Sequence, residues 1–429
     1  MDIVVIGAGI VGLASAWQLR RDGHRVTVVD RSETVAAGAS HANGGQLSYR
    51  YVAPLADPDV LAKLPGWMLR RDAPVRFRPR FDPDQWRWIA RFLRACNAGD
   101  KQRTVASLLP LSLYSRALMH ELATGHGLAF DHVRSGKLVL YRDAASYASA
   151  RRLLAVNADL AAEQHALDGD ACLAVEPALE RLRGHIRGAI HTPGEEAGDC
   201  LTLCRALAAR LSEGPNAVRF ALGREVTALA ATRGRVTAAV AADERFAADA
   251  FVLANGVAAP ALMRPLGVTL PIYPVKGYSI SVAVTDAAAL PATSVTDFER
   301  KIVYARLGGR LRVAGMADIV GLDDGIERRR VATLVRETRE TFGTGVDHTT
   351  VMPWAGMRPA TPGGRPIIDR AGASNLWLNV GHGALGFTLA MGSARVLADR
   401  LAGHEPVVPD AAFALAAAHP RGGSLWRSA

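Results

Sequence analysis

The sequence predicts an α/β protein in which a parallel, Rossmann-like sheet is interleaved with a second part made of an antiparallel sheet plus helices. Three observations predict this fold. The first 30 residues read as strand, glycine turn, helix and strand. A strand, a meander and a closing apolar strand later lead to a turn at 255–256. A second glycine turn, at 381–386, again lies between a strand and a helix. Strands that alternate with helices are typical of a parallel sheet with helices on its faces.

The opening segment carries a glycine pattern that indicates dinucleotide binding. Gly7, Gly9 and Gly12 follow an apolar run in G-x-G-x-x-G spacing, and a second apolar run ends at Asp30. Gly7 permits a tight turn, Gly9 lets the backbone approach a pyrophosphate, and Gly12 lets the helix pack close to the strand. Asp30 is placed to accept a hydrogen bond from a ribose 2′-hydroxyl. A 2′-phosphate would meet a carboxylate there, which argues against NADP.

The chain is expected to leave this sheet and return to it twice. The strand VRFAL, the meander after it and the strand AFVLA belong with the opening strands, whereas the strand-rich residues 270–315 suit an antiparallel sheet. We therefore expect a discontinuous dinucleotide-binding domain and a substrate domain. The first is expected to comprise 1–50, 195–265 and 350–415, and the second 51–194 and 266–349. Helices are expected at 82–126, 143–166 and 201–213, with a short strand in GKLVLYR between the first two.

Composition limits the class of protein. The four cysteines form no C-x-x-C pair, and no cluster of His, Cys and carboxylates has metal-ligand spacing, so we expect no metal. No run approaches the ~20 apolar residues of a membrane-spanning helix, and the opening run lacks the basic flank of a secretory signal. We expect a protein that is cytoplasmic or peripheral on the cytoplasmic face of the inner membrane. No nucleic-acid fold motif accompanies the net charge of +10, so nucleic acid is not an expected partner.

The excess positive charge is concentrated in residues 61–94. This segment holds nine Lys and Arg against three Asp, together with Trp67, Trp86 and Trp88. Basic residues mixed with aromatic rings suit an anionic lipid surface. The other interpretation, slightly favoured, is a pair of ordinary helices whose arginines cover apolar packing.

The second glycine turn decides between one cofactor and two. Gly381, Gly383 and Gly386 repeat the G-x-G-x-x-G spacing, which taken alone suggests a separate NAD site. The prolines of EPVVPD argue against a central strand after this turn, so a second half of a dinucleotide-binding domain cannot follow. One long FAD molecule, contacted by distant segments of the chain, is the simpler interpretation. The helix after Gly386 would direct its positive end at an anionic part of the cofactor.

Four further segments resemble a known family. GASHANGGQL, YPVKGYS, WAGMRPATPGGRPIID and LWLNVGHGALGFTLAMGS are similar to the bacterial FAD-dependent D-amino-acid dehydrogenases, within the wider group of D-amino-acid, glycine and sarcosine oxidising flavoenzymes. The resemblance implies oxidative deamination of D-amino acids to 2-oxo acids and ammonia. The α-hydrogen would pass as hydride to flavin N5, and the electrons would pass to a quinone or another acceptor. Two alternatives stay open: an oxygen-using glycine, sarcosine or D-amino-acid oxidase, and a D-proline or D-hydroxyproline dehydrogenase.

The same resemblance, combined with the motifs, gives the candidate site residues. Arg358 is the expected carboxylate clamp, because a planar guanidinium binds a carboxylate bidentately. Weaker candidates for the substrate pocket are Tyr51, Tyr278, Tyr304, Lys276 and His382. No residue is assigned as an acid or base, since a neutral amine needs none. Non-covalent FAD is expected, because residues 300–400 contain no cysteine. The expected cofactor contacts are Gly7, Gly9, Ile10, Val11, Gly12, Asp30, Arg31, Ser40, Asn43, Gly44, Gly45, Gln46, Leu47, Val226, Asn255, Gly256, Gly381, His382, Gly383, Leu385, Gly386 and Thr388.

Overall fold

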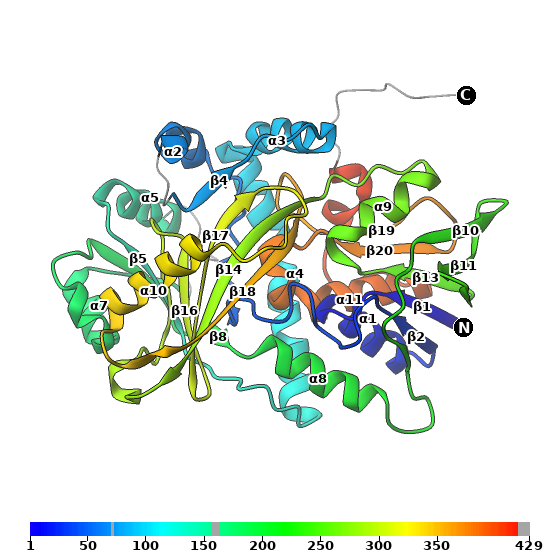
Figure 1. Cartoon of the computed structure of the whole chain (residues 1–429), viewed down its shortest axis with the longest axis horizontal. Coiled ribbons are helices and arrows are strands. Elements are labelled where there is room, and N and C mark those ends of the chain that lie inside the picture. The colour runs from blue at the N-terminus through cyan, green and yellow to red at the C-terminus, as the bar shows by residue number, and fades with distance from the viewer. Residues whose placement is uncertain (70–72, 156–162, 419–429) are drawn as a thin grey trace.

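A computed structural model describes residues 1–69, 73–155 and 163–418 of the chain (Figure 1). Its first sheet has six strands in the order β19-β20-β13-β1-β2-β9, and every neighbouring pair is parallel except β19 with β20. The strands are β1 (Asp2–Ile6), β2 (Arg25–Val29), β9 (Arg219–Ala221), β13 (Ala250–Leu253), β19 (Ile367–Arg370) and β20 (Leu376–Val380). Strands from three distant parts of the chain therefore form one sheet, which confirms the predicted fold class.

Apolar residues on successive positions of β1 face opposite sides of this sheet and build two cores. Ile3 and Val5 pack against α1 (Ile10–Arg21), α8 (Cys200–Leu211) and α11 (Gly386–Ala402). Val4 and Ile6 pack under α9 (Ala259–Met263) and the meander of β10 (Ala228–Thr232), β11 (Arg235–Ala241) and β12 (Glu244–Ala247). Both faces of the sheet are thus covered, which explains why its strands are continuous apolar runs.

The second sheet has nine strands in the order β18-β14-β17-β16-β15-β5-β7-β6, with β4 paired to β17. The strands are β4 (Val75–Phe77), β5 (Lys137–Tyr141), β6 (His165–Leu167), β7 (Gly188–Thr192), β14 (Tyr273–Val284), β15 (Ser294–Asp297), β16 (Ile302–Leu307), β17 (Arg310–Ile319) and β18 (Val346–Ala360). One face packs against α10 (Arg328–Phe342) and α7 (Gly169–Val175). The other face meets residues 38–47. Residues 350–360, which the sequence places in the dinucleotide-binding part, pair in this sheet.

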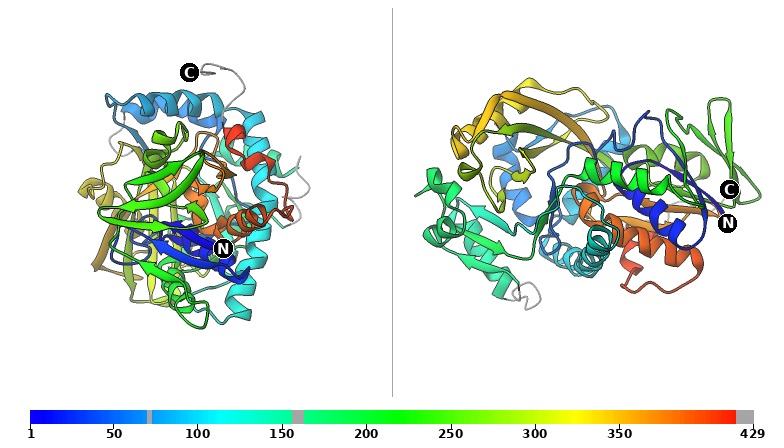
Figure 2. Two further views of the ribbon diagram at one scale, coloured as in Figure 1. Left: turned by 90° about the vertical axis from the view of Figure 1, so that its right-hand side faces the viewer. Right: turned by 90° about the horizontal axis from the view of Figure 1, so that it is seen from below.

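Four more α-helices complete the described part of the chain. They are α2 (Pro58–Leu69), α3 (Pro83–Ala95), α4 (Ala98–His120) and α5 (Ala144–Ala155). Helices α2 and α3 lie along one side of the molecule (Figure 1). The predicted helix over 82–126 is interrupted at 96–97, because Asn97 accepts from Asp100 N–H and caps a new helix. Part of the predicted helix 143–166 lies outside the described residues. Helix α4 lies beside α11 (Figure 2), where a Cβ on Gly392 would stand 2.7 Å from Leu111 O.

Two short strands, β3 (Gln46–Leu47) and β8 (Glu196–Ala197), pair with each other and with no strand of the two larger sheets. The stretch 188–200, which is rich in glycine, contains β7 as well as β8. Both strands are held by partners distant in sequence, and local propensity carries little information about such pairing. The β3–β8 pairing joins Gln46 and Leu47, at the end of the 38–47 segment, to Glu196 and Ala197.

Candidate active site

The first glycine turn has the geometry of a dinucleotide-binding turn. Gly7 has φ +117°, and a Cβ there would lie 2.6 Å from the carbonyl oxygen of Ala254, which directly follows the neighbouring β13. A Cβ on Gly12 would stand 1.9 Å from Gly7 O, so α1 can approach β1 only at a glycine. Gly9 precedes α1 as its cap residue and keeps accessible surface. The turn thus leaves backbone open at the start of the helix.

Ser40 joins the 38–47 segment to this turn. Its Oγ accepts a 3.0 Å hydrogen bond from Ile10 N–H, at the first residue of α1. The next N–H groups, on Val11 and Gly12, belong to the first helical turn and have no acceptor within the helix. Together with the helix dipole they favour a phosphate group.

Asp30 ends β2 beside the same turn. Its carboxylate accepts from Ala8 N–H at 2.7 Å and from Ser32 N–H at 2.8 Å, and the residue is half-buried. Asp30 therefore braces the glycine loop and still presents surface for a ribose. Arg31, next in the chain, is exposed, whereas Val226 packs half-buried beneath the meander.

The loop 38–47 is fixed to the nine-stranded sheet. Ser279 Oγ donates to Ala42 O at 2.7 Å, and Arg312 Nη1 donates to Asn43 O at 2.7 Å. A Cβ on Gly44 would stand 2.9 Å from the side chain of Val303 on β16. This face of the sheet and the loop lie so close that only glycine fits between them.

Gln46 is held by side chains from the same sheet. Lys137 Nζ donates to Gln46 Oε1 at 2.9 Å and to Ser48 Oγ at 2.7 Å, and Thr296 Oγ1 donates to the same amide oxygen at 3.2 Å. Lys137 is buried, and burial lowers its pKa to about 8. Sequence reasoning missed Lys137, because nothing local distinguishes it from another strand residue.

The segment 48–51 is fixed by a buried acid that sequence reasoning also missed. The Glu195 carboxylate accepts from the N–H groups of Arg50, at 2.7 Å, and Tyr51, at 3.1 Å. Burial raises the pKa of Glu195 despite these bonds. Tyr51 packs beside Phe298, and Lys137 Nζ lies 4.5 Å from the centre of its ring.

The C-terminal glycine turn follows β20 of the six-stranded sheet. Gly381 has φ +80° and Gly383 has φ +55°, and both precede α11. The His382 ring is buried and bonded to Ser393 Oγ at 3.1 Å, so its imidazole points into the helix packing. Burial lowers the pKa of His382 to about 3. Thr388 Oγ1 accepts from Ser48 N–H at 3.2 Å, which joins α11 to the 38–48 segment.

Several other predicted cofactor contacts lie in the turns that follow β13 and β20 or in the 38–47 segment. Asn255 and Gly256, with φ +59°, follow β13, and the Asn255 Oδ1 is buried without a hydrogen-bond partner. Leu385 and Gly386 begin α11 and are half-buried. Gly45 has φ +67° and, like Leu47, is buried.

Arg358 stands on β18, opposite Val275 of β14. Its Nη1 donates to Met316 O at 2.8 Å, and a Cβ on Gly277 would stand 2.3 Å from Nη2. Burial lowers the pKa of the guanidinium, yet the side chain keeps accessible surface. No carboxylate within the described residues lies at ion-pair distance from it. A desolvated cation without a counterion is costly, so this position favours an anionic ligand.

Strand alternation places Arg358 and Ser279 on the same face of the sheet, the face that meets 38–47. Tyr278 and Tyr304 lie on the opposite face, fully buried in the core under α10. Lys276 also points there, and its Nζ contacts Asp323 at 3.4 Å. The structure therefore brings Arg358 and Tyr51 to the loop side and separates Lys276, Tyr278 and Tyr304 from them.

The described residues contain one cluster with metal-binding atoms, which sequence spacing did not show. His120, His132 and Glu196 offer atoms within 4.8 Å of one another. His132 Nε2 lies 2.7 Å from Glu196 Oε2, and His120 bonds to the other oxygen. Burial would raise the pKa of Glu196, but the bonds from His132 and His120 outweigh it and hold the pKa below its usual range.

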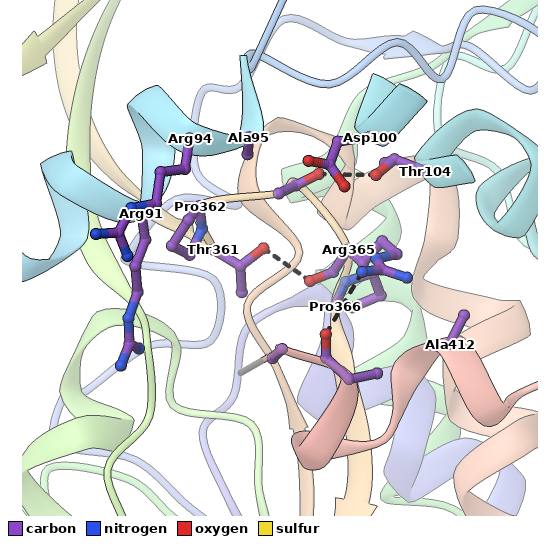
Figure 3. A pocket seen from close by; sticks show the side chains of 13 residues that line it. Arg91, Arg94, Ala95, Asp100, Thr104, Thr361, Pro362, Arg365, Pro366 and Ala412 are labelled. Atoms are coloured by element: carbon purple, nitrogen blue, oxygen red, sulfur yellow. Dashed lines mark hydrogen bonds between the residues drawn. The ribbon is translucent and has the colours of Figure 1, made fainter. Parts of the chain in front are cut away.

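A separate cavity of about 190 Å³ opens beyond the Arg358 strand, between α3, α4 and the turn 361–366 (Figure 3). Thr104 Oγ1 donates to Gly363 O at 3.1 Å, and Thr361 Oγ1 donates to Arg365 O at 2.7 Å. These bonds hold the R-P-x-T-P-x-G-x-P turn in place. The cavity lies outside the face that Arg358 shares with the 38–47 loop.

Comparisons with known proteins agree with this arrangement. Residues 2–400 match the family model described as DAO, FAD dependent oxidoreductase. The chain belongs to this family of FAD-dependent oxidoreductases. It is 51% identical to "D-amino acid dehydrogenase 2" of Ralstonia nicotianae, across 97% of this chain and all of that protein. It is 48% identical to "D-amino acid dehydrogenase 2" of Pseudomonas aeruginosa, across 95% of this chain and 96% of that one. These relatives confirm the predicted resemblance.

Solved structures show the same fold in this family. Glycine oxidase from Geobacillus kaustophilus superposes with a TM-score of 0.76 at 22% identity, over 96% of this chain and 98% of that one. FAD fits the residues of this chain, because Gly7 and Gly12 allow the tight turn between β1 and α1, and Gly9 and Val11 keep accessible surface at the start of the helix. Among the described residues, the buried Asn255 Oδ1 has no hydrogen-bond partner, so it is free to accept a bond from a ligand.

Much of the basic and aromatic segment 61–94 is used in packing. Trp88 and Phe92 are buried against β14 and β17, and Arg76 pairs with Asp318 at 2.6 Å. Phe81 and Trp86 remain exposed. Among the described residues, every helix is too short or too polar to traverse a lipid bilayer.

Proposed function

We propose that this FAD-dependent oxidoreductase is a dehydrogenase of D-amino acids. It would convert them to 2-oxo acids and ammonia and pass the electrons to a quinone or another acceptor. The observation that carries the proposal is Arg358, a desolvated guanidinium that no carboxylate of the described residues pairs with, on the sheet face that meets the 38–47 loop. The names of the two curated relatives support the substrate class.

The side chains of this chain would orient the substrate. Arg358 would bind the α-carboxylate bidentately, with Met316 O and Gly277 fixing its guanidinium. Lys137 and Thr296 hold Gln46, and Glu195 holds the backbone of 50–51, so the opposite wall of the site is rigid. Holding the α-carbon in one position removes much of the entropic cost of the reaction. FAD, when bound, supplies the acceptor for the α-hydrogen and its electron pair.

The contacts to FAD are proposed from the same geometry. The glycine turn at 7–12 and Ser40 would hold the pyrophosphate, and Asp30 the adenosine ribose. The loop 43–47 and the start of α11 would enclose the flavin. We propose domains of 1–50, 195–265 and 350–415 for FAD and of 51–194 and 266–349 for substrate, with the correction that residues 350–360 pair in the substrate sheet. Attachment would be non-covalent, because all four cysteines are buried in packing positions.

Anaerobic flavin reduction tests the activity. Purified protein mixed with D-alanine without oxygen is expected to lose its flavin absorbance and to reduce an artificial quinone. The same concentration of L-alanine serves as the matched control. Flavin reduction by L-isomers alone would overturn the proposal. Hydrogen peroxide formed at the rate of substrate loss would favour an oxidase, and a preference for D-proline would favour the alternative dehydrogenase.

We also propose that the protein lies in the cytoplasm or peripherally on the cytoplasmic face of the inner membrane. Phe81 and Trp86 are exposed beside Arg87 and Arg94 of α3, which suits an interfacial contact. Charge reversal of Arg87 and Arg94 should weaken binding to anionic vesicles in a flotation assay. Arg76 is unsuitable for this test because its ion pairs stabilise the fold, and Arg70 and Arg71 lie outside the described residues. Equal flotation of variant and wild type would remove the membrane contact.

A further inference from the structure

A second half-buried cation, Lys301, lies just before β16 and is linked to Arg358 through β17. Lys301 O accepts from Met316 N–H at 3.4 Å, and Met316 O accepts from Arg358 at 2.8 Å. One residue of β17 therefore connects the two cations. Lys301 directly precedes β16, and its Nζ lies over the ring of Phe298, which packs with Tyr51. Lys301 thus faces the side of the sheet on which the substrate is proposed to bind.

The backbone at this point is strained. Lys301 has φ +55° and Met316 has φ +65°, and both are non-glycine residues in the left-handed region. Such conformations are uncommon and cluster at functional sites, where surrounding structure maintains them. Here the two residues are bonded to each other next to Arg358, so the strain is concentrated beside the proposed substrate position.

Within the described residues, the Lys301 ammonium has no carboxylate at ion-pair distance. Its Nζ lies 3.8 Å from the centre of the Phe298 ring, a contact that favours the charged form. Burial nevertheless lowers the pKa of Lys301 to about 8, and the side chain keeps accessible surface. The ammonium is therefore desolvated but open to a ligand, as Arg358 is.

Two acidic groups act on Lys301 from beyond ion-pair distance. Asp57 lies 2.6 Å from Lys101 Nζ. Glu299 Oε2 accepts from Arg142 N–H at 2.9 Å, and its Oε1 has no hydrogen-bond partner among the described residues. Lys63 also faces the Phe298 ring, at 5.4 Å, but it pairs with Asp59 at 3.6 Å. Of these two lysines at the Phe298 ring, Lys301 is thus the one that no described carboxylate pairs directly.

We propose that Lys301 binds the side-chain carboxylate of an acidic D-amino acid whose α-carboxylate is held by Arg358. The proposal rests on the proposed function and specifies its substrate class. A ligand with two carboxylates would neutralise both desolvated cations, whereas a neutral amino acid would neutralise only one. The half-exposed Tyr51 and Phe298 rings would contact the methylene groups between the carboxylates.

The test compares D-glutamate with D-glutamine, which has the same shape without the charge. With the FAD-loaded enzyme and an artificial acceptor, kcat/KM should be at least about tenfold higher for D-glutamate, since a desolvated charge pair discriminates strongly. Lys301→Met should lower the D-glutamate value by about 30-fold or more and change the D-glutamine value by less than about threefold. Lys63→Met is the matched control, and both of its values should stay within about threefold of wild type.

A charge-reversed variant keeps the test informative if Lys301→Met proves unstable. Lys301→Glu should shift the preference from D-glutamate toward D-lysine. Equal or lower wild-type activity on D-glutamate than on D-glutamine would overturn the proposal, and so would a uniform loss on every substrate in Lys301→Met. Failure of all D-amino acids to reduce the flavin would instead overturn the proposed function, which distinguishes the two outcomes.

Discussion

The indole Nε1 of Trp88 donates a 2.7 Å hydrogen bond to the carbonyl oxygen of Ala360, two residues beyond Arg358. This bond fastens α3 to the end of the strand that carries the proposed carboxylate clamp. Both groups are buried, so the bond cannot be replaced by water without rearrangement. The basic and aromatic segment is thereby connected to the site through one side chain.

Trp88→Phe should therefore loosen the Arg358 strand. We expect about 1–3 kcal/mol less free energy of unfolding, because a buried carbonyl loses a donor, and a raised KM for D-alanine. Chemical denaturation and steady-state kinetics measure the two effects. Trp86→Phe is the control on the same helix, since Trp86 is exposed and bonds only to Arg80 O at 3.0 Å. Equal losses in the two variants would contradict the role of Trp88.

Arg358→Ala should lower kcat/KM for D-alanine roughly 10²–10⁴-fold. This corresponds to a loss of about 3–5 kcal/mol of transition-state stabilisation. The variant removes a charge-assisted contact that also orients the α-carbon. FAD content should not change, because Arg358 contacts the backbone of β17 and none of the glycine turns. Arg358→Lys should recover only a part of the loss, since an ammonium cannot form the bidentate pair. Wild-type kcat/KM in Arg358→Ala would refute the clamp.

Gly7→Ala should abolish FAD binding. The new Cβ would meet Ala254 O at 2.6 Å at a φ of +117°, so β1 and β13 would have to separate at the cofactor turn. Gly23→Ala is a matched control, because Gly23 also has a positive φ, +84°, but has open space around it. That control should lose about 1 kcal/mol of stability and retain its flavin. The absorbance ratio of flavin to protein, measured after gel filtration, distinguishes the two variants.

His382 should make the protein less stable in acid. Its pKa is about 3 in the folded protein against 6.5 ordinarily, so between these values the unfolded chain binds a proton that the folded chain does not. Above about pH 6.5, His382 does not reduce the free energy of unfolding. Below that pH, the free energy of unfolding falls as the pH falls. We expect a loss of roughly 1–2 kcal/mol between pH 7 and pH 5.

Urea denaturation at several pH values tests this expectation. His382→Asn should flatten the pH dependence, while substitution of the exposed His404 should leave it unchanged. A slope that is identical in wild type and His382→Asn would show that other groups cause the acid sensitivity.

The parts of the fold that depend on local pattern were predictable. The glycines at 7, 9 and 12 require a particular turn, and Asp30 follows an apolar strand, so strand–turn–helix–strand could be read directly. The antiparallel sheet could be predicted from its apolar strands, although its strand order could not. Arg358 could be predicted as the carboxylate clamp because the motif around it resembles that of the D-amino-acid dehydrogenases.

The remaining parts depend on contacts between distant residues. Lys137 on β5 bonds to Gln46, 91 residues away in the chain, and Glu195, in the turn before β8, bonds to Arg50, 145 residues away. Neither residue has a local signature in the sequence. Tyr278 and Tyr304 look like pocket residues in the sequence, but strand register turns both away from the loop. A shift of one residue in strand register would move both side chains to the other face of the sheet. The register itself is set by pairing across the whole sheet.

The strand order of the six-stranded sheet also has a consequence for synthesis. β1 is made first, but its partner β13 is made some 245 residues later and β20 after that. At roughly 5–20 residues per second, β1 and α1 wait on the order of 12–50 s for β13. During this interval their apolar faces have no native cover, and the glycine turn cannot close on a nucleotide. We therefore expect the nascent chain to need protection from aggregation, and FAD to bind only after β13 has joined the sheet.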